Sequence, residues 1–342
     1  MVSRMNLDRS LNAIIDSDLL DRISRVKAYR RGRSDKRLNL FMPSHLFPTI
    51  SITGPMCALS CKHCEGRLLE GLVPAGDSDA LLRIALKLGE SGAFGMLVTG
   101  GCDGQGRVGI ERFLGAIREI KDETDLLVIA HTGFVTPRVA EMLAESGLDG
   151  VALDVVGDSV TAKRVYGLDV APEDYLQSMC ALLDAGVDLF PHVCVGLDFG
   201  RLSGEYQALR MIHEVSVSIP RVVITALMPL SGTLMAGKKP DPADVLRVVC
   251  DAVELFSDRS VLLGCAHSVG RDRGLIEIFA LDCGVTNIAV PTMRLLKYAQ
   301  THGYDVNYYG TCCGLGAREE TRIADEINFM SYEEYSKTTY RL

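Results

Sequence analysis

The sequence predicts an α/β protein built as a parallel βα barrel, a full or nearly full (β/α)8 barrel of the TIM type. Three observations predict this fold. Short β-rich runs alternate with longer amphipathic runs from Pro48 onward, and eight such pairs can be counted along the 342 residues. The β-rich runs are nearly continuous in apolar residues, as are parallel strands that are covered on both faces. The total length suits eight units of a barrel, and a doubly wound sheet is the alternative.

The expected elements divide the chain into three parts. Apolar positions at helical spacing over 6–28 predict one or two helices in an N-terminal extension, 1–44. The barrel is expected over 45–303, with strands at 49–54, 95–101, 126–133, 150–157, 189–196, 221–229, 260–268 and 286–292. Helices are expected at 78–91, 109–123, 136–147, 172–186, 205–216, 242–256 and 292–303. The C-terminal extension, 304–342, leaves the repeat and carries GTCCGLG (310–316), followed by a charged helical segment.

The composition excludes several classes of protein. Apolar residues make up 47% and charged residues 23%, as in globular domains, and the net charge of −8 argues against a nucleic-acid partner. The first twenty residues interleave acids with apolar residues, unlike a signal peptide, and no run of eighteen apolar residues occurs. We therefore expect a cytoplasmic protein with no membrane partner. In a reducing compartment the eleven cysteines are not expected to form a disulfide framework.

Three cysteines follow the first expected strand, in GPMCALSCKHCEG (54–66). Their spacing, CxxxCxxC, places Cys57, Cys61 and Cys64 on one short loop. Soft thiolates suit iron–sulfur chemistry, and three ligands would leave one iron of a cubane with an open coordination position. A zinc site completed by His63 or by a distant cysteine is the alternative. The position of the loop after a first barrel strand favours the cluster.

Polar and sulfur-containing residues also gather where the other expected strands end. Barrel enzymes carry their chemistry at the carboxyl ends of strands. The residues at these ends are Gly100, Gly101, Cys102, His131, Thr132, Asp154, His192, Cys194, Met228, Pro229, Cys265, His267 and Pro291. By contrast, Cys180, Cys250 and Cys283 are expected to be packing residues.

The CxxxCxxC loop after a first barrel strand resembles the signature of the radical S-adenosylmethionine (radical SAM) superfamily, and the resemblance covers about residues 45–300. It implies that Cys57, Cys61 and Cys64 hold a 4Fe-4S cluster whose open iron binds S-adenosylmethionine (SAM). In that superfamily, reductive cleavage of SAM yields a 5′-deoxyadenosyl radical. Beyond the cluster and the cofactor, no catalytic side chain is expected.

Two positions depart from the pattern of the superfamily. His63 stands where Tyr or Phe usually packs near the adenine. In TGGCD (99–103), Cys102 replaces the acid of the usual Gly-Gly-Glu, which meets the methionyl amino group. Gly100 and Gly101 still allow close backbone approach, and Asp103 is expected to meet the ammonium group instead.

Two further cofactor contacts are implied by the resemblance. Asp154 lies at the end of the fourth expected strand, where members often hold the ribose or the methionyl group. A cap for the following helix is the alternative role for this carboxylate. Met228 and Pro229, in ALMPLSGT (226–233), resemble the segment that meets the adenine through backbone groups.

The cysteines outside the CxxxCxxC loop predict a second, auxiliary iron–sulfur cluster. Adjacent cysteines such as Cys312 and Cys313 do not readily bond to each other, but they can ligate neighbouring irons. We expect the auxiliary ligands to be these two residues, Cys265 and Cys102, with Cys194 as the alternative to Cys102. Free thiols without a metal are the other interpretation. A cluster inside the barrel would indicate sulfur donation or an electron path.

Longer stretches narrow the resemblance. Residues 131–158, 164–206 and 225–233 look like the group related to biotin synthase, and most like one subunit of the two-component lipoyl synthases of archaea and some bacteria. This likeness implies C–H activation and sulfur insertion into a protein-bound octanoyl group. The implied partners are a sister radical SAM subunit, an octanoylated lipoyl carrier protein such as the glycine cleavage H protein, and an electron donor. The alternative is another biotin synthase-like enzyme (a mutase, dehydrogenase or methylase), with the extra cysteines serving electron transfer.

Overall fold

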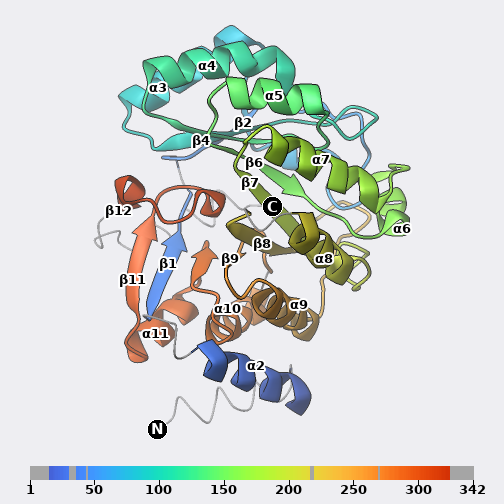
Figure 1. Ribbon diagram of the computed structural model, residues 1–342, viewed down its shortest axis with the longest axis vertical. Coiled ribbons are helices and arrows are strands. Elements are labelled where there is room, and N and C mark those ends of the chain that lie inside the picture. Colours follow the sequence, from blue (N-terminus) through green and yellow to red (C-terminus); the bar gives the residue numbers. More distant parts are fainter. Residues whose placement is uncertain (1–14, 31–35, 44, 216–218, 269, 324–342) are drawn as a thin grey trace.

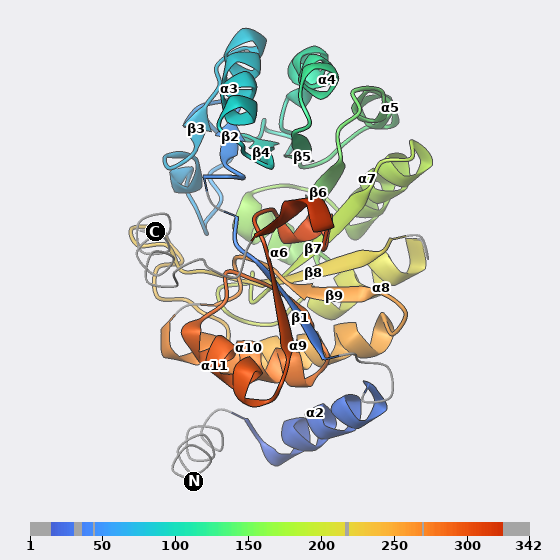
Figure 2. The same ribbon diagram turned by 90° about the vertical axis from the view of Figure 1, so that its left-hand side faces the viewer.

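A single curled sheet organises the protein (Figure 1). The computed structural model describes residues 15–30, 36–43, 45–215, 219–268 and 270–323. Among these residues the sheet has twelve strands in the order β12-β11-β1-β10-β9-β8-β7-β6-β5-β4-β2-β3. Neighbouring strands are parallel except for β11 and β12. The helices lie on the outside of this half-barrel (Figure 2), so the expected α/β barrel class is confirmed.

All eight expected strands are present, each shorter than its sequence range. They are β2 (Thr49–Ser51), β4 (Gly95–Thr99), β5 (Leu127–His131), β6 (Gly150–Asp154), β7 (Leu189–Val195), β8 (Arg221–Ala226), β9 (Ser260–Leu263) and β10 (Asn287–Ala289). The residues beyond each strand end belong to the loops that carry the chemistry. Four further strands are β1 (Arg37–Phe41), β3 (Val73–Pro74), β11 (Asp305–Tyr309) and β12 (Arg322–Ile323).

The helices follow the strands in the expected alternation. The longer ones are α2 (Ser17–Arg30), α3 (Ser78–Glu90), α4 (Leu114–Glu123), α5 (Pro137–Glu145), α7 (Pro172–Asp184), α8 (Glu205–Val215), α9 (Pro242–Leu255), α10 (Arg273–Asp282) and α11 (Met293–Thr301). Short turns are α6 (Ser159–Thr161), a π-turn at Ala162–Tyr166, and 3-10 turns at Arg67–Leu69, Ile110–Phe113, Gly270–Asp272, Cys313–Leu315 and Glu319–Thr321. Asp77 and Thr136 cap their helices through Ala80 N and Val139 N, at 2.7 Å and 3.3 Å.

Helix α10 was not expected from the sequence. Eight of its ten residues, Gly274 to Leu281, are buried. A helix that is apolar all round lacks the 3.6-residue pattern that distinguishes an amphipathic helix. Periodicity therefore could not separate this segment from the strand and loop next to it.

The N-terminal extension differs from the expectation of helices alone. Its described part contains helix α2, but also β1, which lies between β10 and β11 and is parallel to both. Leu38 and Leu40 of β1 are completely buried, whereas Arg37 is exposed. Five residues are too few for a period to stand out, and the partners of β1 are about 250 positions away. Residues 1–14, and most of the charged segment expected after residue 316, lie outside the described residues.

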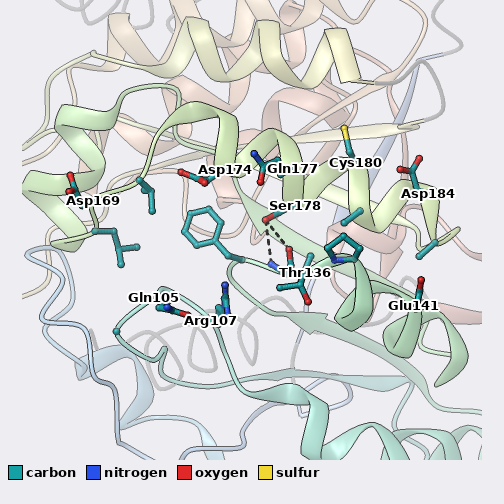
Figure 3. Close-up of a pocket in the computed structure, with 18 residues that line it drawn as sticks. Gln105, Arg107, Thr136, Glu141, Asp169, Asp174, Gln177, Ser178, Cys180 and Asp184 are labelled. Carbon is teal, nitrogen blue, oxygen red and sulfur yellow. Dashed lines mark hydrogen bonds between the residues drawn. The ribbon is translucent and has the colours of Figure 1, made fainter.

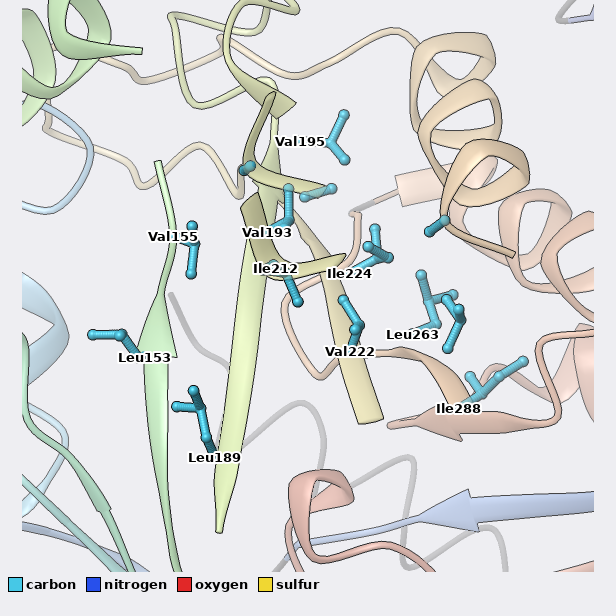
Figure 4. Packing of buried hydrophobic residues seen from close by; sticks show 14 of the residues in the cluster. Leu153, Val155, Leu189, Val193, Val195, Ile212, Val222, Ile224, Leu263 and Ile288 are labelled. Atoms are coloured by element: carbon cyan, nitrogen blue, oxygen red, sulfur yellow. The ribbon is translucent and has the colours of Figure 1, made fainter. Parts of the chain in front are cut away.

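Both faces of the central strands are buried, which explains their continuous apolar runs. Val222 and Ile224 of β8 pack with Val193, Val195 and other residues of the main core beneath the helices (Figure 4). Val223, between them, belongs to a second cluster on the inside of the sheet. Burying one such side chain contributes about 1.5–3 kcal/mol.

The inside of the sheet is filled by the chain's own C-terminal segment. Cys313 packs with Phe41 and Val223, Leu315 packs with Phe190, and Cys312 contacts both of these clusters. Arg221 Nε donates to Gly314 O at 2.7 Å, which anchors the turn from below. Figure 2 shows this red segment after β11 on the inside of the arc of strands. Within the described residues, no helix combines the length and the apolar character that crossing a membrane requires.

Candidate functional site

The CxxxCxxC loop is anchored at two points beyond the end of β2. Ala58 N donates to Cys102 O, and Lys62 N donates to Val165 O, both at 2.8 Å. Within the loop, Cys64 N and Glu65 N both donate to Cys61 O, at 3.1 Å and 2.8 Å. This turn places the last two cysteines of the motif side by side at the carboxyl end of the strands.

The donor atoms of the loop are sulfur and imidazole nitrogen. The Sγ atoms of Cys61 and Cys64 and a ring nitrogen of His63 lie within 4.8 Å of one another, whereas Cys57 stands outside that group. His63 Nδ1 is buried and has no hydrogen-bond partner in the described part of the chain. The neighbouring carboxylate, Glu65, is engaged, because its Oε1 accepts from Leu234 N at 2.9 Å. Such a set fits an iron–sulfur cluster, whose ligands bind different irons, and its imidazole keeps the zinc alternative open.

The two neighbouring thiols are electrostatically distinct. A hydrogen bond from Cys61, supported by His63, lowers the pKa of Cys64 to about 4. The same hydrogen bond, together with burial, raises the pKa of Cys61. One thiolate is therefore present at neutral pH, and thiolate is the form that binds metal.

Glycine is required where the loop meets the end of β4. A Cβ on Gly101 would lie 2.0 Å from Met56 O and 2.6 Å from the Cα of Cys57. Gly101 N also donates to Thr53 Oγ1 at 2.7 Å. Gly101 therefore allows close backbone approach, and the backbone that approaches it is that of the cysteine loop itself. Gly100 has a similar but looser contact, at 3.0 Å from the side chain of Thr53.

The residues after these glycines form a tight turn. Asp103 is exposed, and its Oδ1 accepts from Gln105 N and Arg107 N at 2.8 Å and 3.0 Å. One carboxylate oxygen is thus occupied by the turn. Cys102 is half-buried, and burial, together with the nearby Cys57, raises its pKa to about 12. The structure therefore places Cys102 beside the cysteine loop.

Asp154 lies at the end of β6 and faces two histidines. Its Oδ2 is 3.6 Å from His131 Nε2, and the rings of His131 and His192 are 6.2 Å apart. Burial alone would raise the pKa of Asp154, but the charges of these histidines outweigh it and hold the pKa at about 2. The following helix is capped by Asp158, so a capping role for Asp154 is wrong. A carboxylate that stays ionised and 47% exposed is free to bind a ligand.

The segment after β8 borders the cysteine loop on its other side. Met228 and Pro229 are half-buried there, and the turn that follows contacts the loop through Gly232 and Leu234. A cavity of about 620 Å³ lies between the turn and the loop, lined by residues that include Cys57. A larger cavity, of about 730 Å³, lies between α5, α7 and residues 104–107 (Figure 3) and contains none of the loop cysteines.

Comparisons with known proteins favour one of the alternatives for this loop. Residues 51–200, which include all three cysteines, match the model of the Radical SAM superfamily. Over these residues the chain is similar to the radical SAM superfamily. This likeness favours a 4Fe-4S cluster and SAM at the CxxxCxxC loop over the zinc site that is the alternative. No curated protein matches the chain.

Solved structures agree with the radical SAM fold. Methylornithine synthase (PylB) is 14% identical, with a TM-score of 0.59 over 82% of this chain and 80% of that protein. The FeFe-hydrogenase maturase HydG from Carboxydothermus hydrogenoformans is 14% identical, with a TM-score of 0.60 over 92% of this chain and 77% of HydG. At such identities the likeness shows the fold alone.

Three further cysteines, Cys265, Cys312 and Cys313, are named the interior group, and two of them, Cys312 and Cys313, pack on the inside of the sheet. A hydrogen bond from the Cys313 thiol lowers the pKa of Cys312 and raises that of Cys313. Burial, together with the nearby Cys312, raises the pKa of Cys265 to about 11. Cys265 is nonetheless exposed, so its side chain faces open space although protein surrounds it. Cys265, which follows β9, and the two tail thiols therefore influence one another's pKa, but they are not a compact donor set like Cys61, His63 and Cys64.

Cys102 and Cys194, the two residues expected as a fourth auxiliary ligand, have other neighbours that shift their pKa values. Cys102 is influenced most by Cys57 and Asp103. Cys194 is influenced by Asp154, and its thiol is hydrogen-bonded to Thr225. The thiol of Cys313 has the largest effect on the pKa of Cys312, and the charge of His131 contributes a smaller lowering. The sequence indicates His131 only as a residue at the end of an expected strand, the strand that is β5 in the structure.

Proposed function

We propose that this protein is a radical SAM enzyme that inserts sulfur into a protein-bound octanoyl group, as one of the two subunits of a lipoyl synthase. The observation that carries the proposal is the adjacent pair Cys312 and Cys313, which packs on the inside of the sheet, while Cys265 influences the pKa of Cys313. A sulfur-donating cluster needs its own ligands, separate from the CxxxCxxC loop and inside the same barrel. All three of these residues lie outside residues 51–200, the part of the chain that the radical SAM model matches.

The chemistry explains why a radical and a sulfur donor would be combined. The C–H bonds of a saturated chain carry no acidic proton, so general acid–base catalysis cannot break them. When bound, the 4Fe-4S cluster and SAM supply the radical that removes hydrogen. The chain itself holds these groups, orients the substrate and excludes water with its apolar interior.

Within this proposal the residues around the loop bind SAM. His63 packs against the adenine, and the backbone at Met228 and Pro229 meets its edge. Gly100 allows close approach at the methionyl end, where the remaining oxygen of Asp103 receives the ammonium group. Asp154 accepts from the ribose hydroxyls through the oxygen that does not face His131. The ionised and half-exposed state of Asp154 supports that role.

The proposal includes three partners, namely a sister radical SAM subunit, an octanoylated carrier such as the glycine cleavage H protein, and an electron donor. The test combines the full chain, the sister subunit, a strong reductant, SAM and octanoylated carrier protein without oxygen. Mass spectrometry of the carrier should show thiolated octanoyl, and 5′-deoxyadenosine should accumulate. Deoxyadenosine without thiolated carrier would instead favour another biotin synthase-like enzyme. If neither product forms, the result contradicts radical chemistry.

A further inference from the structure

The inner face of the sheet changes from apolar to polar toward the amino ends of four adjacent strands. Side chains alternate along β8, so Val222 packs beneath the helices while Arg221 and Val223 face the interior. The same alternation holds in β1, β10 and β9, whose apolar interior residues are Phe41, Ala289 and Leu262. The interior residues nearer the amino ends of these strands are polar, namely Arg37, Asn39, Asn287 and Ser260.

A cavity of about 300 Å³, the amino-end cavity, lies between these amino ends and the tail. Its described lining consists of the four polar residues above and Arg221, together with Thr286, Gly316 and Ala317. None of these residues is acidic, although the whole chain has a net charge of −8. The lining therefore provides two guanidinium groups together with amide and hydroxyl donors. Such donors without a carboxylate among them favour an anion as the ligand.

Arg221 is the cation whose position the structure defines best. Its Nε donates to Gly314 O at 2.7 Å, and its guanidinium lies over the ring of Phe190, 5.3 Å from the centroid. Within the described residues, no carboxylate forms an ion pair with this half-buried side chain. Burial lowers the pKa of Arg221, and the charge of Asp188 offsets this only in part. A cation in such a position is stabilised when an anion binds beside it.

The neighbouring polar groups are held in register by the sheet. Arg221 and Ser260 are Cα partners across β8 and β9. Asn39 and Asn287 are Cα partners across β1 and β10, and Asn39 Nδ2 donates to Asn287 Oδ1 at 3.0 Å. A guanidinium, a hydroxyl and two amides are therefore fixed on one rigid surface, as a binding site requires.

We propose that the amino-end cavity binds a small oxyanion, a phosphate or carboxylate group that is free or part of a small metabolite. The two Nη groups of Arg221, which the bond to Gly314 leaves, donate to two oxygens of such a group. The tail lies against the same guanidinium, since a Cβ on Gly316 would be 3.2 Å from Arg221 Nη1. Anion binding therefore holds the tail, and with it Cys312 and Cys313, against the sheet. This inference goes beyond the proposed function and requires neither SAM nor a cluster.

The test measures anion binding by the full chain, purified without oxygen, with isothermal titration calorimetry. Inorganic phosphate and succinate are the probes, and their relative affinities distinguish a phosphate site from a carboxylate site. We expect saturable binding of at least one probe at a single site, with chloride at matched ionic strength unable to replace it. Binding should also slow amide hydrogen exchange over residues 310–317 and leave the loop at 54–66 unchanged. No saturable binding of either probe would overturn the proposal.

Substitutions locate the site. Arg221→Lys keeps the positive charge but loses the planar fork, so the dissociation constant of the bound probe should rise about tenfold. Ser260→Ala removes one hydroxyl and leaves the contact between Arg221 and the tail, so it tests the cavity even if Arg221→Lys does not fold. We expect it to raise the dissociation constant about threefold. Unchanged binding in Ser260→Ala and in folded Arg221→Lys would overturn the assignment to this cavity.

Two other arginines set the scale of the effect. Arg37→Gln should weaken binding less than Arg221→Lys, because Arg37 is exposed and has Asp305 as its Cα partner on β11. Arg138→Gln, at an exposed position on α5, is the matched control and should leave the dissociation constant unchanged. Equal weakening by Arg138→Gln and Arg221→Lys would show general attraction of anions to the surface, which contradicts a built site.

Discussion

The two cysteine groups of this protein are built in opposite ways. The first lies within eight residues, from Cys57 to Cys64, and two backbone hydrogen bonds hold it beside β4 and the turn after β6. The second combines Cys265, just after β9, with a tail nearly fifty residues later. The first group is therefore encoded by spacing along the chain. The second exists only because the tail folds back into the barrel.

The largest expected effects are losses of reaction products, and they differ between the two cysteine groups. Cys61→Ala should reduce both 5′-deoxyadenosine and thiolated carrier to background, because SAM cleavage needs the first cluster. Cys312→Ala should abolish only the thiolated carrier. Liquid chromatography with mass spectrometry measures both products. Cys180→Ala, an exposed position on α7, should change neither. Loss of deoxyadenosine in Cys312→Ala would show that the two groups act as one.

A second prediction concerns the support of the interior group. Glu277→Gln should lower the free energy of unfolding by about 3–5 kcal/mol, because it removes the completely buried carboxylate that pairs with the largely buried guanidinium of Arg273. Chemical denaturation at neutral pH measures this. Glu254→Gln, in an exposed ion pair with Arg22, should cost no more than about 1 kcal/mol. Equal effects would mean that the network is not structural.

The same carboxylate predicts a pH dependence. Burial alone would raise the pKa of Glu277, but the hydrogen bond and charge of His267 outweigh it and place the pKa below its usual value of 4.5. The stabilisation is therefore complete above pH 4.5 and is lost as the pH falls through the lower, folded value. In denaturation series over this range, Glu277→Gln should lack that component of the acid-induced loss. An unchanged acid profile would contradict this assignment.

The third prediction tests the support of the loop. Gly101→Ala should cost about 1–3 kcal/mol, because the new methyl group overlaps Met56 O and the loop must move. The iron bound by the first group should fall with it, while the interior group keeps its own. Gly104→Ala is the matched control, since nothing lies within 4 Å of a Cβ there. Full iron content in Gly101→Ala would show that the close approach does not position the loop.

The smallest effect is expected for a cysteine outside both groups. Cys250 on α9 is completely buried, and its Sγ lies 3.3 Å from that of Cys283. Cys250→Ala should cost about 1 kcal/mol in unfolding free energy, through lost packing. Iron content and both reaction products should stay at the wild-type level. A loss of iron would show that metal binding extends to this pair.

The sequence predicted the alternating strands and helices of the barrel well, but it did not predict several elements outside this pattern. All eight alternating units are present, because each strand is buried on both faces and most helices are amphipathic. β1, β11 and α10 were not predicted. β1 and β11 are short and pair across about 265 residues, from Arg37 to Asp305, and α10 lacks a polar face. In each case the stabilising contacts are tertiary, so the local pattern does not show them.

The candidate site also has a part that the sequence determines and a part that only the tertiary structure determines. The spacing of Cys57, Cys61 and Cys64 determines the loop by itself, because residues so close in sequence must be close in space. Only the tertiary structure decided that Cys102 lies beside that loop, that Asp154 faces His131, and that the tail cysteines lie inside the barrel with Cys265. These residues come from different strands, and their distances depend on how the sheet curls and where the tail packs. Spacing along the chain carries no information about either.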